Sequence, residues 1–204
     1  MQTTNQNTFN RYLTQAEERA LFRCVKDHAG PLAARDYQWM RLARNTGLRV
    51  GSLAGLTVMD ARLALASKHM AIRSDIAKRK QAHTVHLNKH ARAALVALLK
   101  IRRELGHPET DSAPLIMSRN KNGLSIRSFQ ARMRYWAKKA DLPVQATPHW
   151  FRHTLAMRLM KNSTAQDPRG VVQGALGHRD INSTAVYTRP SREDVALALD
   201  EVGS

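Results

Sequence analysis

A single cysteine, Cys24, is the only thiol in the 204 residues of this chain. One thiol cannot form an intramolecular disulfide, and it leaves no thiolate cluster to bind zinc. A disulfide-stabilised secreted domain and a cysteine-based zinc domain are therefore excluded. The lack of paired cysteines predicts a cytoplasmic protein, because that compartment is reducing.

Long hydrophobic runs are missing as well. No stretch approaches the roughly 18 uninterrupted apolar residues that a membrane-spanning helix needs. Residues 1–14 contain no cationic segment followed by an apolar one, which is the pattern of a secretory leader. We therefore expect a soluble, unexported protein with no membrane partner.

Acidic residues are few. Asp and Glu number 16 against 33 Lys and Arg, which gives a net charge of +17 and an isoelectric point near 11.0. This excess predicts a polyanionic partner, since each neutralised phosphate of a nucleic acid releases condensed counterions. A ribosomal or membrane-surface protein is the alternative. Such proteins usually concentrate charge in tails or on one helix face, whereas here it is spread through segments with apolar periodicity.

Aromatic residues make up only 5% of the chain, but a hydrophobic content of 43% is enough for the core of one domain. Thr14 with Glu17 forms a helix-capping pattern, and Gly47 is placed to end a helix. One helix is predicted to begin near Thr14 and another near Val50. Further helices are predicted at 33–46, 89–105, 125–140, 148–161, 169–176 and 181–187, and the last begins at Ser191.

Alternating apolar residues predict three short strands between these helices. The first includes Leu63 and Leu65, and the others cover 69–72 and 83–87, with 74–82 containing the turn between them. Residues 114–117 form a possible further strand. The predicted fold class is therefore α+β, mainly α with a small antiparallel three-stranded sheet.

Three short segments carry the chemistry. They are TGLR at 46–49, PHWFRHT at 148–154 and LGHRDINSTAVYTR at 176–189, where Tyr187 follows His178 by nine residues. A guanidinium can donate two parallel hydrogen bonds to phosphate oxygens without losing its proton, and a phenol can attack when a base assists it. In a strongly basic chain these groups predict attack on a phosphodiester.

In this order, the motifs resemble those of the tyrosine recombinases, or phage integrases. The resemblance covers Tyr12 to about residue 190. It rests on five motifs in order, which are TGLR, a basic hairpin, HxxRHT, LGH and a tyrosine nine residues on, and together they are far more specific than any one of them. It implies the recombinase catalytic-domain fold and a site-specific DNA recombinase with a 3′-phosphotyrosine intermediate. Few residues precede the resemblance, so the chain looks like the short, catalytic-domain-only type, such as the fimbrial phase-variation invertases.

Carried over motif by motif, the resemblance implies catalytic roles for Arg49, Lys78, His149, Arg152, His178 and Tyr187. The two arginines would clamp the phosphate, His149 would accept the proton of Tyr187, and His178 would donate a hydrogen bond to the phosphate. Lys78 would protonate the leaving 5′ oxygen. It is selected by the family's usual spacing from Leu87, and Arg79 and Lys80 remain possible.

The resemblance also implies partners. These are double-stranded DNA with paired inverted sites, further copies of the chain as a dimer of dimers, and possibly a DNA-bending accessory protein. The residues expected to contact DNA are Lys80, Arg127, Arg134, Lys138 and Arg179. The face with Arg127, Arg134 and Lys138 could instead be merely solvated. No cofactor or metal is expected, and the sequence has no Walker loop or EF-hand pattern.

The domain organisation follows from this resemblance. Residues 1–13 are expected to be a flexible segment, 14–190 the catalytic domain, and 191–204 a C-terminal helix. Val195, Ala198, Leu199 and Val202 form an apolar stripe on that helix. This stripe is expected either in the protein's own core or docked into a neighbouring subunit.

One departure from the family pattern concerns Arg49. The family usually has an acidic residue three positions after this arginine, and Ser52 stands there. The missing carboxylate would leave Arg49 less firmly oriented, although the serine hydroxyl could still bond it.

Some histidines and tryptophans have plainer interpretations. His149 and His153 have the i, i+4 spacing of a zinc pair, but no Glu lies between them and no third ligand is indicated. His153 is expected to be structural, and Trp136 and Trp150 are expected in the core. Five further histidines are expected on the surface or in strands: His69, His83, His86, His90 and His107.

Two other functions remain open. A type IB topoisomerase would share the chemistry but relax supercoils alone, and LGH with its nine-residue spacing argues for the recombinase. A DNA-binding regulator with the same fold would not need the intact catalytic set.

Overall fold

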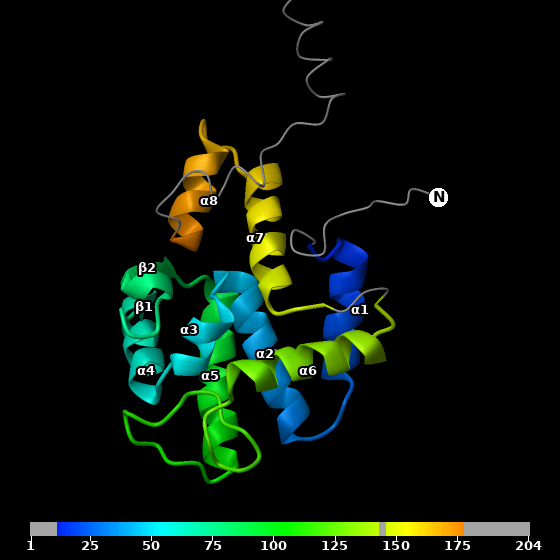
Figure 1. Cartoon of the computed structure of the whole chain (residues 1–204), viewed down its shortest axis with the longest axis vertical. Helices are drawn as coiled ribbons and strands as arrows, with labels where there is room; N and C mark the ends of the chain where they lie inside the picture. Colours follow the sequence, from blue (N-terminus) through cyan, green and yellow to red (C-terminus); the bar gives the residue numbers. More distant parts are fainter. Residues whose placement is uncertain (1–11, 143–145, 178–204) are drawn as a thin grey trace, which may run out of the picture.

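The computed structural model describes residues 12–142 and 146–177. Its elements in chain order are α1 (Gln15–Lys26), α2 (Pro31–Thr46), α3 (Val50–Gly55), α4 (Val58–Ser67), β1 (His69–Ile72), the 3₁₀ turn η1 (Lys78–Lys80), β2 (His83–His86), α5 (Lys89–Glu104), α6 (Ile126–Lys139), α7 (His149–Asn162) and α8 (Pro168–Leu176). Figure 1 shows α1 to α6 and the hairpin as one body, with α7 and α8 extending from it. None of the described helices is long and apolar enough to cross a bilayer.

Two helix boundaries lie where the sequence places them. The Thr14 hydroxyl accepts the Glu17 amide at 3.2 Å, and the Glu17 carboxylate accepts the Thr14 amide at 2.9 Å, which completes the capping box of α1. Gly47 ends α2 with φ 63°, the left-handed conformation that glycine adopts without steric cost.

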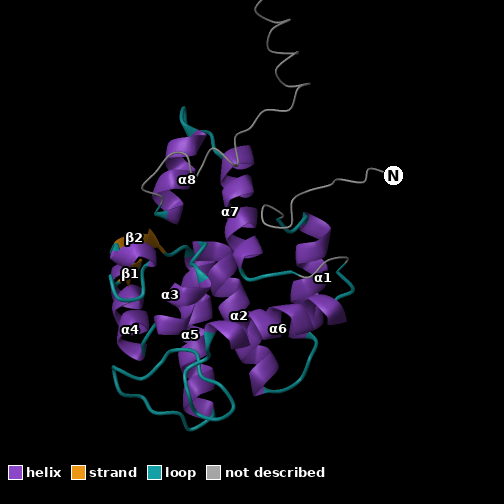
Figure 2. Cartoon of the chain, in the orientation of Figure 1, coloured by secondary structure: helices purple, strands orange, loops and turns teal. Residues whose placement is uncertain are grey.

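The prediction of three strands is wrong. The first segment, with Leu63 and Leu65, belongs to helix α4, so the sheet has two antiparallel strands (Figure 2). A second capping box starts this helix, because Thr57 and Asp60 exchange side-chain to backbone hydrogen bonds. Alanine and leucine dominate the residues that follow, and both favour helix. The two strands pair with His69 opposite His86 and Ile72 opposite His83.

Residues 114–117 do not form a named strand. Pro114 makes an isolated bridge with Thr57, and Met117 makes another with Gly123. Helix α5 holds this segment in place. Its buried Arg102 donates hydrogen bonds to the carbonyls of Pro108 and Pro114. His107 is consequently buried and not on the surface, which corrects its predicted place. Burial and the neighbouring charges of Arg102, Lys121 and Arg35 lower the pKa of His107.

The core is aromatic where the helices cross. Trp39 of α2 contacts Phe129 of α6 with ring centroids 5.0 Å apart, and it also contacts Phe151 of α7. Trp136 and Trp150 are buried, as predicted. On α6 the apolar residues Phe129, Met133, Trp136 and Ala137 are buried, whereas Ile126 in its first turn is 45% exposed. A small separate apolar cluster of Ala156, Val172 and Leu176 joins α7 to α8.

Asp36 is a buried carboxylate that links α2 to α6. It accepts hydrogen bonds from Arg35, from the indole nitrogens of Trp39 and Trp136 at 3.1 and 2.8 Å, and from Arg132 at 2.5 Å. Asp36 itself is completely buried. These donors compensate the cost of burying the charge, and removing the carboxylate would leave two cations and two indoles without their acceptor.

We therefore expect Asp36→Ala to lower the free energy of unfolding by about 3–5 kcal/mol, the range for breaking a buried ion pair. The matched control is Asp111→Ala, which removes the exposed ion pair with Arg62 (2.7 Å) and should cost at most about 1 kcal/mol. Urea denaturation of both variants measures the difference. Equal losses would show that Asp36 has no special structural role.

Candidate active site

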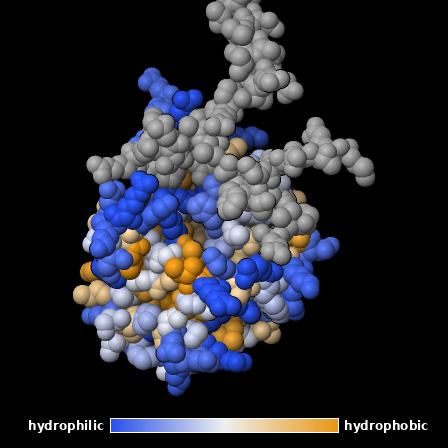
Figure 3. Space-filling model, viewed as in Figure 1, coloured by the Kyte–Doolittle hydropathy of each residue, from blue (hydrophilic) through white to orange (hydrophobic). Residues whose placement is uncertain are grey.

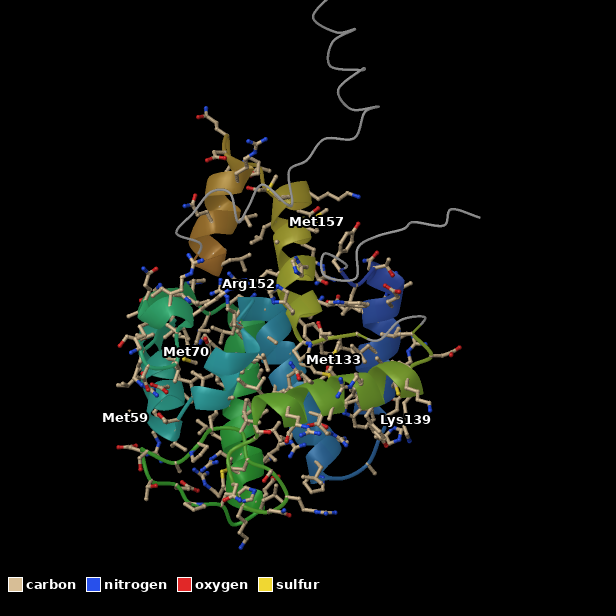
Figure 4. All side chains as sticks on the ribbon, in the orientation of Figure 1. Met59, Met70, Met133, Lys139, Arg152 and Met157 are labelled. Carbon is tan, nitrogen blue, oxygen red and sulfur yellow. The ribbon has the colours of Figure 1, made fainter. Side chains whose placement is uncertain are left out.

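Arg152 lies at the junction of three helices. It belongs to the first turns of α7 (Figure 4). Its side chain is buried, with only 3% of the residue exposed. One terminal nitrogen donates to the Gly47 carbonyl at 2.8 Å, and the other donates to the Leu176 carbonyl at 2.8 Å. Both carbonyls are at the C-terminal ends of helices, where the helix dipole favours a cation. Arg152 therefore holds together the ends of α2 and α8.

The two helix ends approach each other closely around this guanidinium. Gly47 and Gly177 are both left-handed C-caps, with φ 63° and 60°. A Cβ atom on Gly47 would lie 2.4 Å from the Leu176 side chain and 3.8 Å from Arg152. Arg49 follows Gly47 by two residues and is the N-cap of α3, so the contact at Gly47 places Arg49 next to the α7 and α8 junction.

His149 begins α7, one turn before Arg152. Its ring lies 4.4 Å from that of His153, edge to face. Although the residue is exposed, desolvation of its ring and, to a smaller extent, electrostatic interactions with His153, Arg152, Arg49 and Lys78 together lower the pKa of His149 to about 4. The imidazole is therefore neutral at pH 7 and has a nitrogen available to accept a proton.

Lys78 lies in the turn between the two strands. It starts η1, is exposed, and precedes two residues with left-handed backbones, Arg79 (φ 60°) and Lys80 (φ 54°). Its positive charge is one of those that lower the pKa of His149, so the two groups interact electrostatically. Four of the predicted catalytic residues, Arg49, Lys78, His149 and Arg152, are thus brought together from separate parts of the chain.

The hydroxyl of Ser52 bonds to a backbone carbonyl and not to Arg49. It donates to the Ile76 carbonyl at 3.0 Å and is buried, so its hydrogen is not directed to Arg49. Through this bond Ser52 ties α3 to the turn that contains Lys78. Ile76 also packs against Gly55 closely enough that a Cβ there would lie 2.2 Å from its side chain.

Comparisons with known proteins show the family of the chain. The model of the phage integrase family matches residues 11–194. The chain belongs to the phage integrase family. It is 30% identical over 175 residues to the tyrosine recombinase XerC of Psychromonas ingrahamii, a match that covers 86% of this chain and 55% of the relative. It is 35% identical over 169 residues to XerC of Shewanella amazonensis, with 83% and 53% covered. The chain spans about half the length of these curated relatives.

Solved structures show the same fold. The crystal structure of XerA recombinase superposes with a TM-score of 0.71 at 22% identity, covering 98% of this chain and 66% of that one. A Tn1549 transposon integrase in complex with transposon right end DNA gives 0.76 at 18% identity, covering 100% and 69%. The phage integrase fold inferred from the motifs is therefore confirmed, apart from the number of strands.

Part of the predicted site lies outside the described residues. This applies to His178, Arg179 and Tyr187, to the helices predicted at 181–187 and from Ser191, and to most of the N-terminal segment 1–13. The described chain ends at Gly177, directly before His178.

The predicted DNA-contacting residues within the described part are exposed. Arg127, Arg134 and Lys138 lie on α6 and Lys80 lies on η1. Among residues 12–142 and 146–177, none of the three on α6 pairs with a carboxylate. Figure 3 shows hydrophilic side chains interspersed with hydrophobic ones on the face that carries α6. Such a face can approach a polyanion without first breaking ion pairs.

His153 is buried, as expected for a structural histidine. No group of three or more metal-ligating side chains occurs within the described residues. The sequence did not indicate the roles of Gly177 and His83, which contact each other beside this site. Their contact joins a strand to the end of a distant helix, and no local spacing pattern reports such a contact.

The low pKa of His149 makes a prediction about pH. In the unfolded chain an ordinary histidine titrates near ~6.5, whereas in the folded protein the pKa of His149 is about 4. Between these values the unfolded state binds a proton that the folded state does not, so the His149 contribution to stability should rise as pH increases from about 4 to ~6.5 and be constant above.

NMR titration of the DNA-free protein should show a His149 midpoint below pH 5. In urea denaturation, the free energy of unfolding of the natural protein minus that of His149→Gln should increase with pH over the same window. A midpoint of 6.5 or higher would contradict the environment described for this ring.

Proposed function

We propose that this protein is a site-specific DNA recombinase that cleaves and rejoins DNA through a phosphotyrosine on Tyr187. The observation that supports this most is the convergence of Arg49, Lys78, His149 and Arg152, which come from three separate segments of the chain: the start of α3, the turn η1 and the first turns of α7. Membership of the phage integrase family supports it independently.

In the proposed cleavage step the Tyr187 oxygen bonds to phosphorus and the bond to the 5′ oxygen breaks. The phenolic proton goes to His149, which is neutral at pH 7 because its pKa is about 4. Lys78 supplies a proton to the leaving 5′ oxygen. A 5′ hydroxyl from a partner strand then attacks the phosphotyrosine and reverses these transfers. The ester conserves the bond energy, so no ATP is needed.

Arg49 and Arg152 are proposed to stabilise the charge that develops on the phosphate oxygens. Each terminal nitrogen of a guanidinium carries two hydrogens, so a nitrogen that serves a backbone carbonyl can also serve a phosphate. The two carbonyl bonds of Arg152 preorganise its plane. His178 is proposed to donate a further hydrogen bond to the phosphate.

The proposed substrate is double-stranded DNA with paired inverted sites, bound in the cytoplasm. The net charge of +17 and the exposed cations Lys80, Arg127, Arg134 and Lys138 support a DNA partner, and Arg179 is proposed to join them. Solved structures with this fold include XerH bound to its difH substrate, at a TM-score of 0.68 and 20% identity. We also propose a DNA-bending accessory protein, which would bring the paired sites together.

Two assays on the natural protein test this function. A nicked suicide substrate that carries one site should yield a covalent protein–DNA adduct on a denaturing gel. A plasmid with two inverted sites should yield the inverted product. Relaxation of supercoils without exchange would indicate a topoisomerase, and DNA binding without any adduct would indicate a regulator.

We further propose that four copies act together, as a dimer of dimers, through residues 191–204. The side chains of this segment include four acidic residues and one basic one, a net charge of −3, beside its apolar stripe. A groove of about 530 Å³ between α1, α2 and α5 offers the complementary charge. Four cationic residues, Arg19, Lys26, Arg41 and Arg44, line it together with His90, against one acidic residue, Glu18, which pairs with Arg44 at 2.8 Å. Phe22 and Tyr37 also line it, with ring centroids 5.6 Å apart.

Ending the chain after Arg189 should therefore leave a folded monomer that binds a single half-site but no longer occupies paired sites cooperatively or exchanges strands. Circular dichroism, half-site gel shifts and a recombination assay measure these effects. Arg41→Glu, within the groove, should reproduce the loss in the full chain, whereas Lys100→Glu, the same charge change outside it, should not. If the truncated protein is unfolded, residues 191–204 belong to the core of the same chain. If it recombines normally, these residues have no role in assembly.

A further inference from the structure

The ring of His83 covers the last described turn of α8. Gly177 ends this helix with φ 60°, and a Cβ atom built on it would lie 2.5 Å from His83 Cδ2, 3.1 Å from Cγ and 3.2 Å from Nε2. Three ring atoms therefore occupy the space that a side chain at residue 177 would need. A glycine here is required by the contact as well as by the backbone conformation.

His83 is suited to hold such a contact. It is the first residue of β2, opposite Ile72 in the sheet, and it is half-buried while Lys78, Arg79 and Lys80 are exposed. Its Nδ1 lies 3.3 Å from the Gln81 carbonyl, which fixes the ring orientation when Nδ1 carries the hydrogen. The ring edge on the other side then faces Gly177.

This contact connects two parts of the proposed catalytic site. On one side is the turn that contains Lys78, between the strands that His83 helps to pair. On the other side is the end of α8, which continues directly into His178. Arg152 donates a hydrogen bond to the Leu176 carbonyl at the same end of α8. The end of α8 thus lies between the guanidinium of Arg152 on α7 and the imidazole of His83 on β2.

We propose that His83 is a positioning residue of the proposed recombinase. By packing on Gly177, it sets the distance between the Lys78 turn and the chain that enters His178. This inference rests on the proposed function, because the geometry matters only if both groups act on one phosphate. Small displacements of catalytic groups slow a reaction much more than they weaken binding, since a misplacement of about 1 Å can cost roughly a hundredfold.

The first experiment tests the contact without reference to activity. Gly177→Ala combines a left-handed backbone with the clash on His83, whereas Gly106→Ala has the same backbone (φ 63°) and nothing within 4 Å. We expect Gly177→Ala to reduce the folding equilibrium constant about tenfold more than Gly106→Ala. In a His83→Ala background this excess should disappear, because the ring is gone. Persistence of the excess in that background would refute the contact.

The second experiment tests the positioning role with a suicide substrate under single-turnover conditions. His83→Ala should slow covalent cleavage about tenfold and leave half-site affinity within about twofold. His83→Phe keeps a planar ring against Gly177 and should remain within about threefold of the natural rate. Thermal melts confirm that each variant is folded at the assay temperature.

The outcomes separate the two proposals. Cleavage by His83→Ala at the natural rate would overturn the positioning role while leaving the recombinase intact. An equal loss of DNA affinity and cleavage would also overturn it, because it would indicate a general structural defect. Absence of any adduct with the natural protein would instead refute the proposed function, and the glycine comparison would still decide whether the contact exists.

Discussion

Replacing Tyr187 by phenylalanine is expected to abolish the covalent protein–DNA adduct and to leave DNA affinity within a few-fold of the natural value. Phenylalanine keeps the ring and removes only the oxygen that forms the bond to phosphorus. The positive charges that bind the phosphates are unchanged, so the electrostatic part of the binding free energy is retained. Suicide substrates on denaturing gels measure the adduct, and gel shifts measure the affinity.

The structure supplies matched controls for this experiment. Tyr135 is 41% exposed on α6 and lies under the Arg132 guanidinium at 4.6 Å, and Tyr37 packs on Phe22 within the groove. Tyr135→Phe and Tyr37→Phe should both form the adduct. An adduct that persists in Tyr187→Phe and vanishes in one of these controls would reassign the nucleophile.

The second large effect is expected at Lys78. Lys78→Ala should slow cleavage of ordinary DNA severely, because the 5′ oxygen would leave without a proton. A substrate with sulfur at the bridging 5′ position should restore cleavage, since a thiolate leaves without being protonated. Lys80→Ala is the matched control, two residues away on the same exposed turn, and should need no rescue. Rescue of Lys80→Ala in place of Lys78→Ala would move the acid to Lys80.

The arginines should behave differently in the same assay. Their proposed task is to stabilise charge on the non-bridging oxygens, which sulfur at the bridging position does not replace. Neither Arg152→Ala nor Arg49→Ala should therefore be rescued. Arg152 is buried with two carbonyl partners, so its variant must first be shown to be folded. Arg49 is partly exposed at the start of α3 and gives the cleaner comparison. Rescue of Arg49→Ala would contradict the clamp.

Local signals in the sequence were sufficient for most of the fold. The capping boxes, the glycine at the end of α2 and the apolar periodicity of α6 act over a few residues, so they can be recognised without the tertiary structure. The segment with Leu63 and Leu65 was misassigned because a short apolar run of this kind is compatible with either period. Its capping box at Thr57 was the signal that identifies the helix.

By itself, then, the sequence determined the family, the helical framework and the residue types of the site, because motif order and local propensity are written along the chain. Only the tertiary structure decided how those residues meet. The bonds of Arg152 to the ends of α2 and α8, the bond from Ser52 to Ile76 and the packing of His83 on Gly177 all join residues far apart in the chain. The low pKa of His149 has the same origin, because its desolvation and its interactions with His153, Arg152, Arg49 and Lys78 exist only after folding.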